Sequence, residues 1–560
     1  MLKKLMIVLV LLIAVIFVVN VVFDNIVFTT FKNRVVPLDS FTGYPLASKY
    51  GLKKNSKGKA NFNSDLFTAA IKEFGGLIID GKYYLDRPSK LSISEVGIVG
   101  DAEFGSQLIF DLDSSKVLFN SSVLEELYIS DVSIVNNGDS PLLIAYQSGD
   151  INVTVENVTI KNSSFEGNIS AYRVGGDGNV DPNSSDVAIK NFVLQNNVIR
   201  DTVYSFIKLE DIPYDNVLIQ DNEITNFKYV FANLALANSN DYNDELFSLR
   251  KSLIVKNNVV TSDDDWWADS QSDSYYTFIL AEGDKVEYVD NHVEGLKTLE
   301  STWLYDAYLS CNEVIYTGNV SKNNVCLNPD KETSAFIKSK SSSVPAKRTY
   351  SNNTFIIEEA FASKFGASSD SLYVDFYSLE TEAEYYEISN NTFEGYEIRF
   401  PSSSRHIKDF IFNNNTINTK KASGSIINVR VSDDYDLGII EFTSNEINIE
   451  ERAGEGLSDE DVTMLLFRIY NESTLPKEEK INLTQYNNNT ISGPFDFIFY
   501  GARDEFFEIN MDGDSGTFMI DESQEDITIM LDRLDNNYFL TSDYNRFEQS
   551  SSDDINGLIE

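Results

Sequence analysis

The chain has 560 residues and few of the residue types on which several common protein classes depend. Its two cysteines, Cys311 and Cys326, exclude a disulfide scaffold and an array of zinc fingers. Basic residues are scarce, with 45 Lys and Arg against 87 Asp and Glu, giving a formal net charge of −42. Because affinity for a phosphate backbone comes mainly from Lys and Arg, we expect no nucleic-acid partner. The 29 Tyr and 37 Phe, by contrast, are too many for a largely disordered chain.

Residues 1–23 contain a long apolar segment. Lys3 and Lys4 precede a run from Leu5 to Phe23 that only Asn20 interrupts, and about twenty helical residues cross a bilayer core. A cleaved signal peptide starts in the same way, but no small-x-small cleavage site follows this run. We expect a single-pass anchor in the cell membrane with the body outside the cytoplasm; the alternative is a secreted protein. Residues 24–60 are basic and are expected to form a stalk.

A short pattern returns many times after residue 130. Phe192-Val-Leu-Gln-Asn-Asn-Val-Ile199 and Phe410-Ile-Phe-Asn-Asn-Asn-Thr-Ile417 are two examples. With the second Asn as position zero, units centre on residues 137, 163, 197, 222, 258, 291, 319, 353, 391, 415, 445, 489 and 537. Position −3 is apolar in every unit, as expected of a half-buried strand, and Asn tolerates the left-handed conformation of a tight turn. Units stacked about 4.8 Å apart would place Asn over Asn in a hydrogen-bonded ladder.

The spacing of these units predicts a solenoid. The shortest intervals are close to 24 residues, enough for one coil of two or three strands with parallel connections, and longer intervals contain loop insertions. Residues 130–545 are therefore predicted to form a parallel β-helix, followed by an acidic tail at 546–560. The position −3 side chains should stack in one line inside the coil.

Residues 61–129 are predicted to hold a cap and the first coils. A capped helix from Ser64 ends at Gly75-Gly76, and two short strands follow around an Asp80-Gly81 turn. This stretch, with Thr68-Ala69-Ala70-Ile71 and the Asn repeat behind it, resembles the right-handed parallel β-helix proteins of the pectate-lyase-like superfamily. The departures are Asn63-Ser64-Asp65-Leu66-Phe67 before the Thr and Asp80-Gly81 at the turn. The resemblance covers roughly residues 60–545 and implies an all-β, right-handed solenoid.

Relatives with this fold include polysaccharide lyases, glycoside hydrolases, epimerases, phage tailspikes and adhesins. The motifs of polygalacturonase-like enzymes, such as Gly-His-Gly, do not occur here in order. Asp263-Asp-Asp-Trp266-Trp267 is a candidate binding loop, because two Trp beside carboxylates could stack a sugar ring and bind its hydroxyls or a Ca²⁺ ion. Alternatively, Trp266 and Trp267 pack onto the coil and the loop is only acidic. A metal site is otherwise left open.

A second strand precedes each central Asn at a steadier distance. Its charged residues are expected to form one outward row: Lys208, Asp306, Lys338, Asp375, Arg399, Arg430 and Arg468. Alternating charges in such a row could be a simple salt-bridge ladder. In the functional interpretation the row is the floor of a groove for an acidic glycan. Asp306 or Asp375 would then be the acid/base and Lys338 or Arg399 its electrostatic partner. The substrate-binding aromatic residues would be Tyr305, Tyr308, Tyr373 and Tyr377.

Two functions follow from these patterns. The first is a membrane-anchored extracytoplasmic β-helix protein that binds a polysaccharide or cell-envelope glycan and, if it is an enzyme, cleaves it as a lyase or hydrolase. The second is a non-catalytic surface, adhesion or structural protein that uses the same rod as a spacer.

Overall fold

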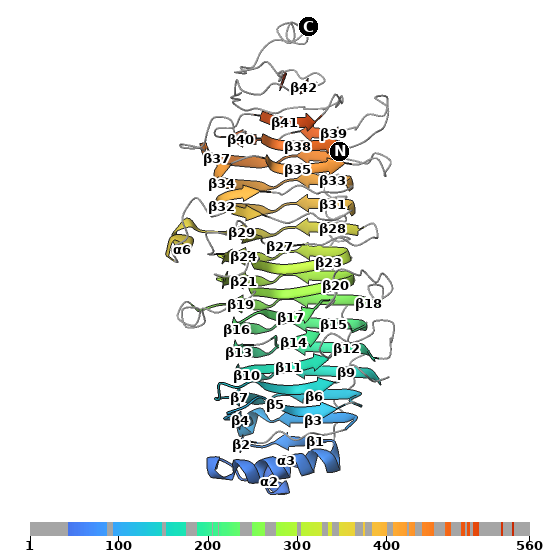
Figure 1. The fold of residues 1–560 in the computed structure, drawn as a ribbon, viewed down its shortest axis with the longest axis vertical. Helices are drawn as coiled ribbons and strands as arrows, with labels where there is room; N and C mark the ends of the chain where they lie inside the picture. Colours follow the sequence, from blue (N-terminus) through green and yellow to red (C-terminus); the bar gives the residue numbers. More distant parts are fainter. Residues whose placement is uncertain are drawn as a thin grey trace, which may run out of the picture.

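The chain forms a long rod of stacked parallel strands in a computed structural model (Figure 1). The structure describes residues 43–86, 93–121, 123–147, 153–174, 187–203, 205–210, 212–235, 249–263, 276–298, 304–326, 334–335, 337–338, 346–364, 373–375, 383–399, 407–422, 425–431, 440–452, 465–471, 483–487, 490–492, 497–502, 528–529 and 540–541. Within these residues, no helix has the length and apolar character needed to cross a bilayer. The predicted anchor at 1–23 and the acidic tail at 546–560 lie outside them, as do residues 24–42 of the predicted stalk.

The strands of the main sheet lie on three faces of the coil, and most of the described coils contribute a strand to each face. The first face consists of β1 (Gly76–Ile79), β3 (Glu95–Gly100), β6 (Glu126–Ser130), β9 (Val153–Lys161), β12 (Val187–Gln195), β15 (Tyr214–Gln220), β18 (Arg250–Lys256), the second halves of β20 (Tyr276–Val289) and β23 (Leu304–Thr317), β28 (Ala346–Ser351), β31 (Ala383–Ser389), β33 (Ile407–Asn413), β36 (Ile440–Thr443) and β39 (Leu483–Asn487).

The second face follows the Asn turn. It consists of β2 (Lys82–Leu85), β4 (Gln107–Phe110), β7 (Ser133–Asn136), β10 (Ser164–Gly167), β13 (Val198–Thr202), β16 (Glu223–Phe227), β19 (Val259–Thr261), β21 (His292–Glu294), β24 (Val320–Lys322), β29 (Thr354–Ile356), β32 (Thr392–Arg399), β34 (Thr416–Ala422), β37 (Glu446–Arg452) and β40 (Thr490–Ser492).

The third face leads back to the first. It consists of β5 (Lys116–Ser121), β8 (Leu142–Gln147), β11 (Ile169–Val174), β14 (Ile207–Leu209), β17 (Val230–Leu234), the first halves of β20 and β23, β26 (Ser334–Ala335), β27 (Ile337–Lys338) and β30 (Tyr373–Asp375). A separate sheet contains β35 (Ser425–Val431), β38 (Leu465–Asn471) and β41 (Phe497–Ala502). The small pairs are β22 (Lys297–Thr298) with β25 (Val325–Cys326) and β42 (Thr528–Ile529) with β43 (Leu540–Thr541), and this last is the antiparallel pair among those described.

The predicted Asn ladder is confirmed along most of the rod. Its members are Asn197, Asn222, Asn258, Asn291, Asn319, Asn353, Asn391, Asn415 and Asn445, each at most 2 % exposed. Each Nδ2 from Asn197 to Asn415 donates to the Oδ1 of the next Asn at 2.9–3.2 Å. The residue before most of these Asn is left-handed, for example Asn257 with φ 54°. The ladder therefore satisfies buried amides at the turn from the first to the second face.

The position −3 side chains stack inside as predicted. Ile219 pairs in register with Val255, and Val255 with Tyr288, and all three are 0 % exposed. The predicted frame at residue 137 is wrong, however. Ile134 pairs with Phe165 in β10, which places it after the turn, and Ile129 is the residue in line with Ile160. The turn here is Asp131-Val132, with Asp131 at φ 59°, so the Asn pair at 136–137 lies elsewhere in the coil.

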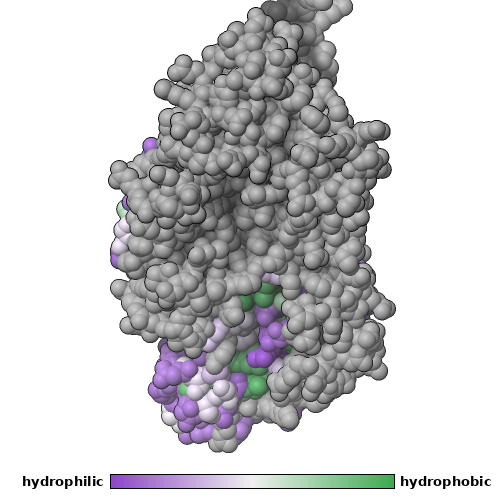
Figure 2. Space-filling model, turned by 45° about the horizontal axis from the view of Figure 1, so that its top comes forward, coloured by the Kyte–Doolittle hydropathy of each residue, from purple (hydrophilic) through white to green (hydrophobic). Residues whose placement is uncertain are grey.

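The predicted N-terminal helix is α3 (Ala60–Phe74), which covers the lower end of the rod (Figure 1). The predicted cap at Ser64 is wrong, because the helix starts at Ala60 and Ser64 is buried within it. It buries Phe67, Ala70 and Ile71 against the first coil, and Gly75 ends it in the left-handed conformation. The other described helical turns are α2 (Ala47–Tyr50), η2 (Lys57–Lys59), η3 (Ala102–Phe104) and α6 (Glu359–Lys364). The coloured surface in Figure 2 is mostly hydrophilic with smaller hydrophobic areas, as expected when the apolar residues fill the coil.

Candidate functional site

The outward row of the third face has a different register from the predicted one. Lys208 pairs with Asn233, which continues through Leu280 to Tyr308 and then to Lys338. Below Lys208 the same row continues to Arg173 and Tyr146. We call Tyr146, Arg173, Lys208, Asn233, Leu280, Tyr308 and Lys338 the third-face row. Asp306 is not in it.

The remaining predicted members of the row do not form a single line. Asp375 is a register partner of Ala335 and Arg399, and Ala335 lies three residues before Lys338. Lys338 and Asp375 are therefore in different rows. Further along, Arg430 pairs with Tyr470, and Arg468 pairs with Asn428, so these two arginines are also not adjacent. Among the described strands, Asp375 and Arg399 are register partners, as are the predicted site residues Tyr308 and Lys338.

Some predicted site residues lie wholly or partly outside the described part of the chain. The side chains of Lys338, Asp375, Arg399, Tyr305 and Tyr373 lie outside the described residues, as do Trp266, Trp267 and Tyr377 altogether. Asp263 is described at the start of the predicted Ca²⁺-binding loop, where its Oδ2 accepts a hydrogen bond from Asn226 Nδ2 at 3.1 Å. Within the described part of the chain, no three His, Cys, Asp or Glu side chains are grouped to hold a metal ion.

The members of the third-face row whose side chains the structure describes are half-buried. Lys208 Nζ lies 2.5 Å from Glu210 Oε2, and the amide of Asn233 donates to the other oxygen of that carboxylate at 3.4 Å. Arg173 Nε is buried and has no hydrogen-bond partner in the described structure. The row therefore combines two cations and an amide with Tyr146 and Tyr308, on a chain that is otherwise strongly acidic.

Asp306 points into the coil rather than outward, so its predicted place in the row is wrong. It is 1 % exposed. On the two strands below, the same interior column holds Phe231 and Phe278, whose ring centroids are 5.5 Å apart. Asp306 thus occupies a position where an aromatic ring would continue the column. In the sequence, Asp306 is a carboxylate within the alternating pattern of a buried strand. The prediction that its side chain points outward hid this interior position.

Three polar side chains surround the Asp306 carboxyl inside the coil. Tyr316 Oη donates to Asp306 Oδ2 at 3.0 Å, and Asn324 Nδ2 lies 3.5 Å from Oδ1. Ser321 replaces an apolar residue after the turn and accepts from Asn324 at 3.0 Å. Burial raises the pKa of Asp306 to about 8, and hydrogen bonds from Tyr316 and Ser321 offset only part of this effect. The carboxyl is therefore protonated at neutral pH and is out of reach of a glycan on the surface.

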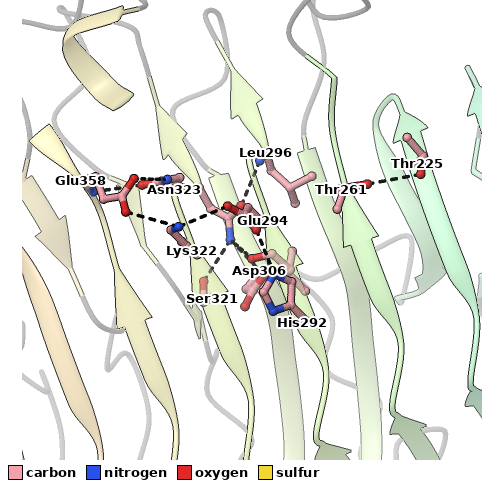
Figure 3. Close-up of polar contacts among 12 residues, drawn as sticks. Thr225, Thr261, His292, Glu294, Leu296, Asp306, Ser321, Lys322, Asn323 and Glu358 are labelled. Carbon is pink, nitrogen blue, oxygen red and sulfur yellow. Dashed lines mark hydrogen bonds and ion pairs between the residues drawn. The ribbon is translucent and has the colours of Figure 1, made fainter. Parts of the chain in front are cut away.

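Figure 3 shows both sides of strand β24. Ser321 faces the interior near Asp306, whereas Lys322 lies outside, 3.5 Å from Glu294 and 3.3 Å from Glu358. His292 Nε2 is 3.0 Å from Glu294 Oε2 in the same network. The charges of this network are paired with one another, an arrangement that contributes little stability in water and needs no ligand.

Comparisons of this chain with protein-family models, with curated proteins and with solved structures find no match. The functional argument therefore rests on the geometry of the faces.

Proposed function

We propose that the chain is an extracytoplasmic parallel β-helix protein that binds an acidic polysaccharide along the third-face row. The observation that carries this proposal is the row itself, in which Arg173, Lys208 and Asn233 follow one another in register. Strands repeat about every 4.8 Å, so the row presents regularly spaced groups to an extended polymer. The whole chain has a net charge of −42, which repels an anionic polymer, so the attraction has to come from a local set of cations such as this one.

The chemistry of the row suits a glycan better than a protein partner. A guanidinium and an ammonium bind carboxylate or sulfate groups, and Lys208 would exchange its contact with Glu210 for one of these groups. Tyrosine rings supply an apolar face for a sugar ring and a hydroxyl for its edge. Tyr308 extends the row towards Lys338, which has the next place in the register.

Binding without cleavage is the form of the proposal that the geometry favours. Glycoside hydrolysis generally uses two carboxyl groups across the bond to be cleaved. Burial of Asp306 leaves Asp375 as the single acid of the predicted pair near this face. The catalytic alternative, a lyase or hydrolase with Asp375, Lys338 and Arg399 in the site and Ca²⁺ as its metal, remains the second candidate.

The proposal also includes the location of the protein and the handedness of its coil. We place the body outside the cytoplasm, attached through residues 1–23, with a cleaved signal peptide and a secreted protein as the alternative. We also expect the coil to be right-handed, as in the pectate-lyase-like superfamily that the cap and the Asn repeat resemble, because parallel crossover connections are almost always right-handed.

Binding to a panel of acidic and neutral polysaccharides, with product release measured in parallel, tests the proposal. Lys208→Gln and Tyr308→Ala should each weaken binding to the acidic member about tenfold, the loss expected for one charge-assisted hydrogen bond or one ring contact. Lys322→Gln on the second face is the matched control and should bind like the unaltered protein. Equal binding of neutral and acidic polymers, or no effect of either row variant, would contradict the proposal; product release abolished by Asp375→Asn would favour the enzyme.

A further inference from the structure

Two arginines are fully buried in the middle of the rod, where the third face turns into the first. Arg250 starts β18 and Arg348 lies in β28, and both side chains are 0 % exposed. A guanidinium stays charged in a protein, so each needs acceptors for five N–H groups and a way to offset its charge.

All five N–H groups of the Arg250 guanidinium have acceptors. Its Nε, Nη1 and Nη2 atoms donate to backbone carbonyl oxygens of Leu209, Ile212, Leu234, Ala235 and Glu282. These carbonyls belong to the corner between the third and first faces in successive coils. Gly283 lies directly beside this arginine, since a Cβ there would be 2.9 Å from the Cβ of Arg250. Arg250 therefore satisfies backbone carbonyl groups at the corner between the third and first faces.

Arg348 does not repeat this arrangement. Its Nη1 donates to the carbonyl oxygen of Cys311, and its Nε and Nη2 have no hydrogen-bond partner in the described structure. Nε and Nη2 form one edge of the guanidinium, where two N–H groups point the same way. This edge is the one that binds a carboxylate or another anion with two parallel hydrogen bonds.

The buried charged groups around Cys311 also carry one more positive than negative charge. Arg250, Arg348 and Glu282 all act electrostatically on the Cys311 thiol, and Glu282 is only 4 % exposed. Burial raises the pKa of this thiol to about 12, so Cys311 stays neutral. Among these groups around Cys311, two guanidinium groups and one carboxylate leave a net charge of +1. An uncompensated buried charge is strongly unfavourable, and protonation changes of an arginine do not relieve it.

We propose that the Nε–Nη2 edge of Arg348 binds one monovalent inorganic anion, such as chloride, inside the solenoid. The anion accepts the two unpaired N–H groups and brings the charge around Cys311 to zero. Arg250, whose five donors already have acceptors, binds none. The site is independent of the third-face row, because it lies inside the coil.

Bromide is the probe, because it substitutes for chloride and scatters anomalously. Crystals of the full chain grown with sodium bromide should show an anomalous peak within hydrogen-bond distance of both Nε and Nη2 of Arg348. In solution, the thermal unfolding midpoint should rise by about 1–2 °C for each tenfold increase in bromide, at ionic strength held constant with methanesulfonate. Arg348→Gln should abolish this dependence, and the matched variant Arg250→Gln should retain it.

The crystal measurement keeps the proposal testable if either variant fails to fold. Water or a protein carbonyl at the Nε–Nη2 edge, with no anomalous peak, would overturn it. A bromide dependence that persists in Arg348→Gln would overturn it as well, because the anion would then act elsewhere.

Discussion

Replacing Asp306 with Asn should stabilise the protein, and the gain should grow with pH. Asp306 is the carboxyl that interrupts the interior aromatic column, and burial raises its pKa to about 8 from a usual value of 3.8. Between these two values the folded chain holds the proton while the unfolded chain releases it. The free energy of unfolding therefore falls as pH rises through this interval. Asn has a similar shape and does not ionise, so the variant escapes this loss.

The size of the effect follows from the shift. Each pH unit between the unfolded and folded pKa values costs about 1.4 kcal/mol, so the variant should gain about 3 kcal/mol on the wild type between pH 5 and pH 7. Entry of water or movement of Tyr316 would reduce this value, which makes it an upper bound. Above the folded pKa the difference should become constant, because both states are then ionised.

Urea unfolding followed by far-ultraviolet circular dichroism at pH 5, 6, 7 and 8 measures the difference. Asp284→Asn is the matched control, since Asp284 is exposed on the first face and should give a profile parallel to the wild type. If Asp306→Asn also runs parallel to the wild type, Asp306 is not a buried, protonated acid and our placement of it is wrong.

Two further substitutions test the ladder and the cap. Asn258→Leu should lower the free energy of unfolding by about 3 kcal/mol, because the backbone N–H and the Nδ2 of Asn222 both lose their acceptor and the two bonds donated by Asn258 Nδ2 also disappear. An unchanged urea midpoint would contradict a structural role for the ladder. Gly97→Ala would place a Cβ 2.2 Å from the Tyr44 ring, so residues 43–52 should detach and become sensitive to limited proteolysis. Gly58→Ala, with open space around its Cβ, should leave the digestion pattern unchanged.

The sequence alone determined the repeating part of this protein. Alternating apolar residues, an Asn pair and another apolar residue are local features, and each coil needs them to fill its interior and turn its chain. Stacking then brings like positions together, so Asn222 meets Asn258 and Ile219 meets Val255 without any further information. The cap helix was equally local, because its Gly75 stop and apolar face lie within a few turns.

Only the tertiary structure decided which residues share a row across different coils. The corner between the third and first faces changes length, and β20 and β23 pass through it without a break as 14-residue strands. Counting back from the next Asn therefore placed Asp306 outside, whereas strand pairing gives Tyr308 that position and turns Asp306 inward. The unpaired edge of Arg348 was hidden for the same reason: its surroundings come from strands far apart in sequence, whose register depends on corner lengths that the repeat does not specify.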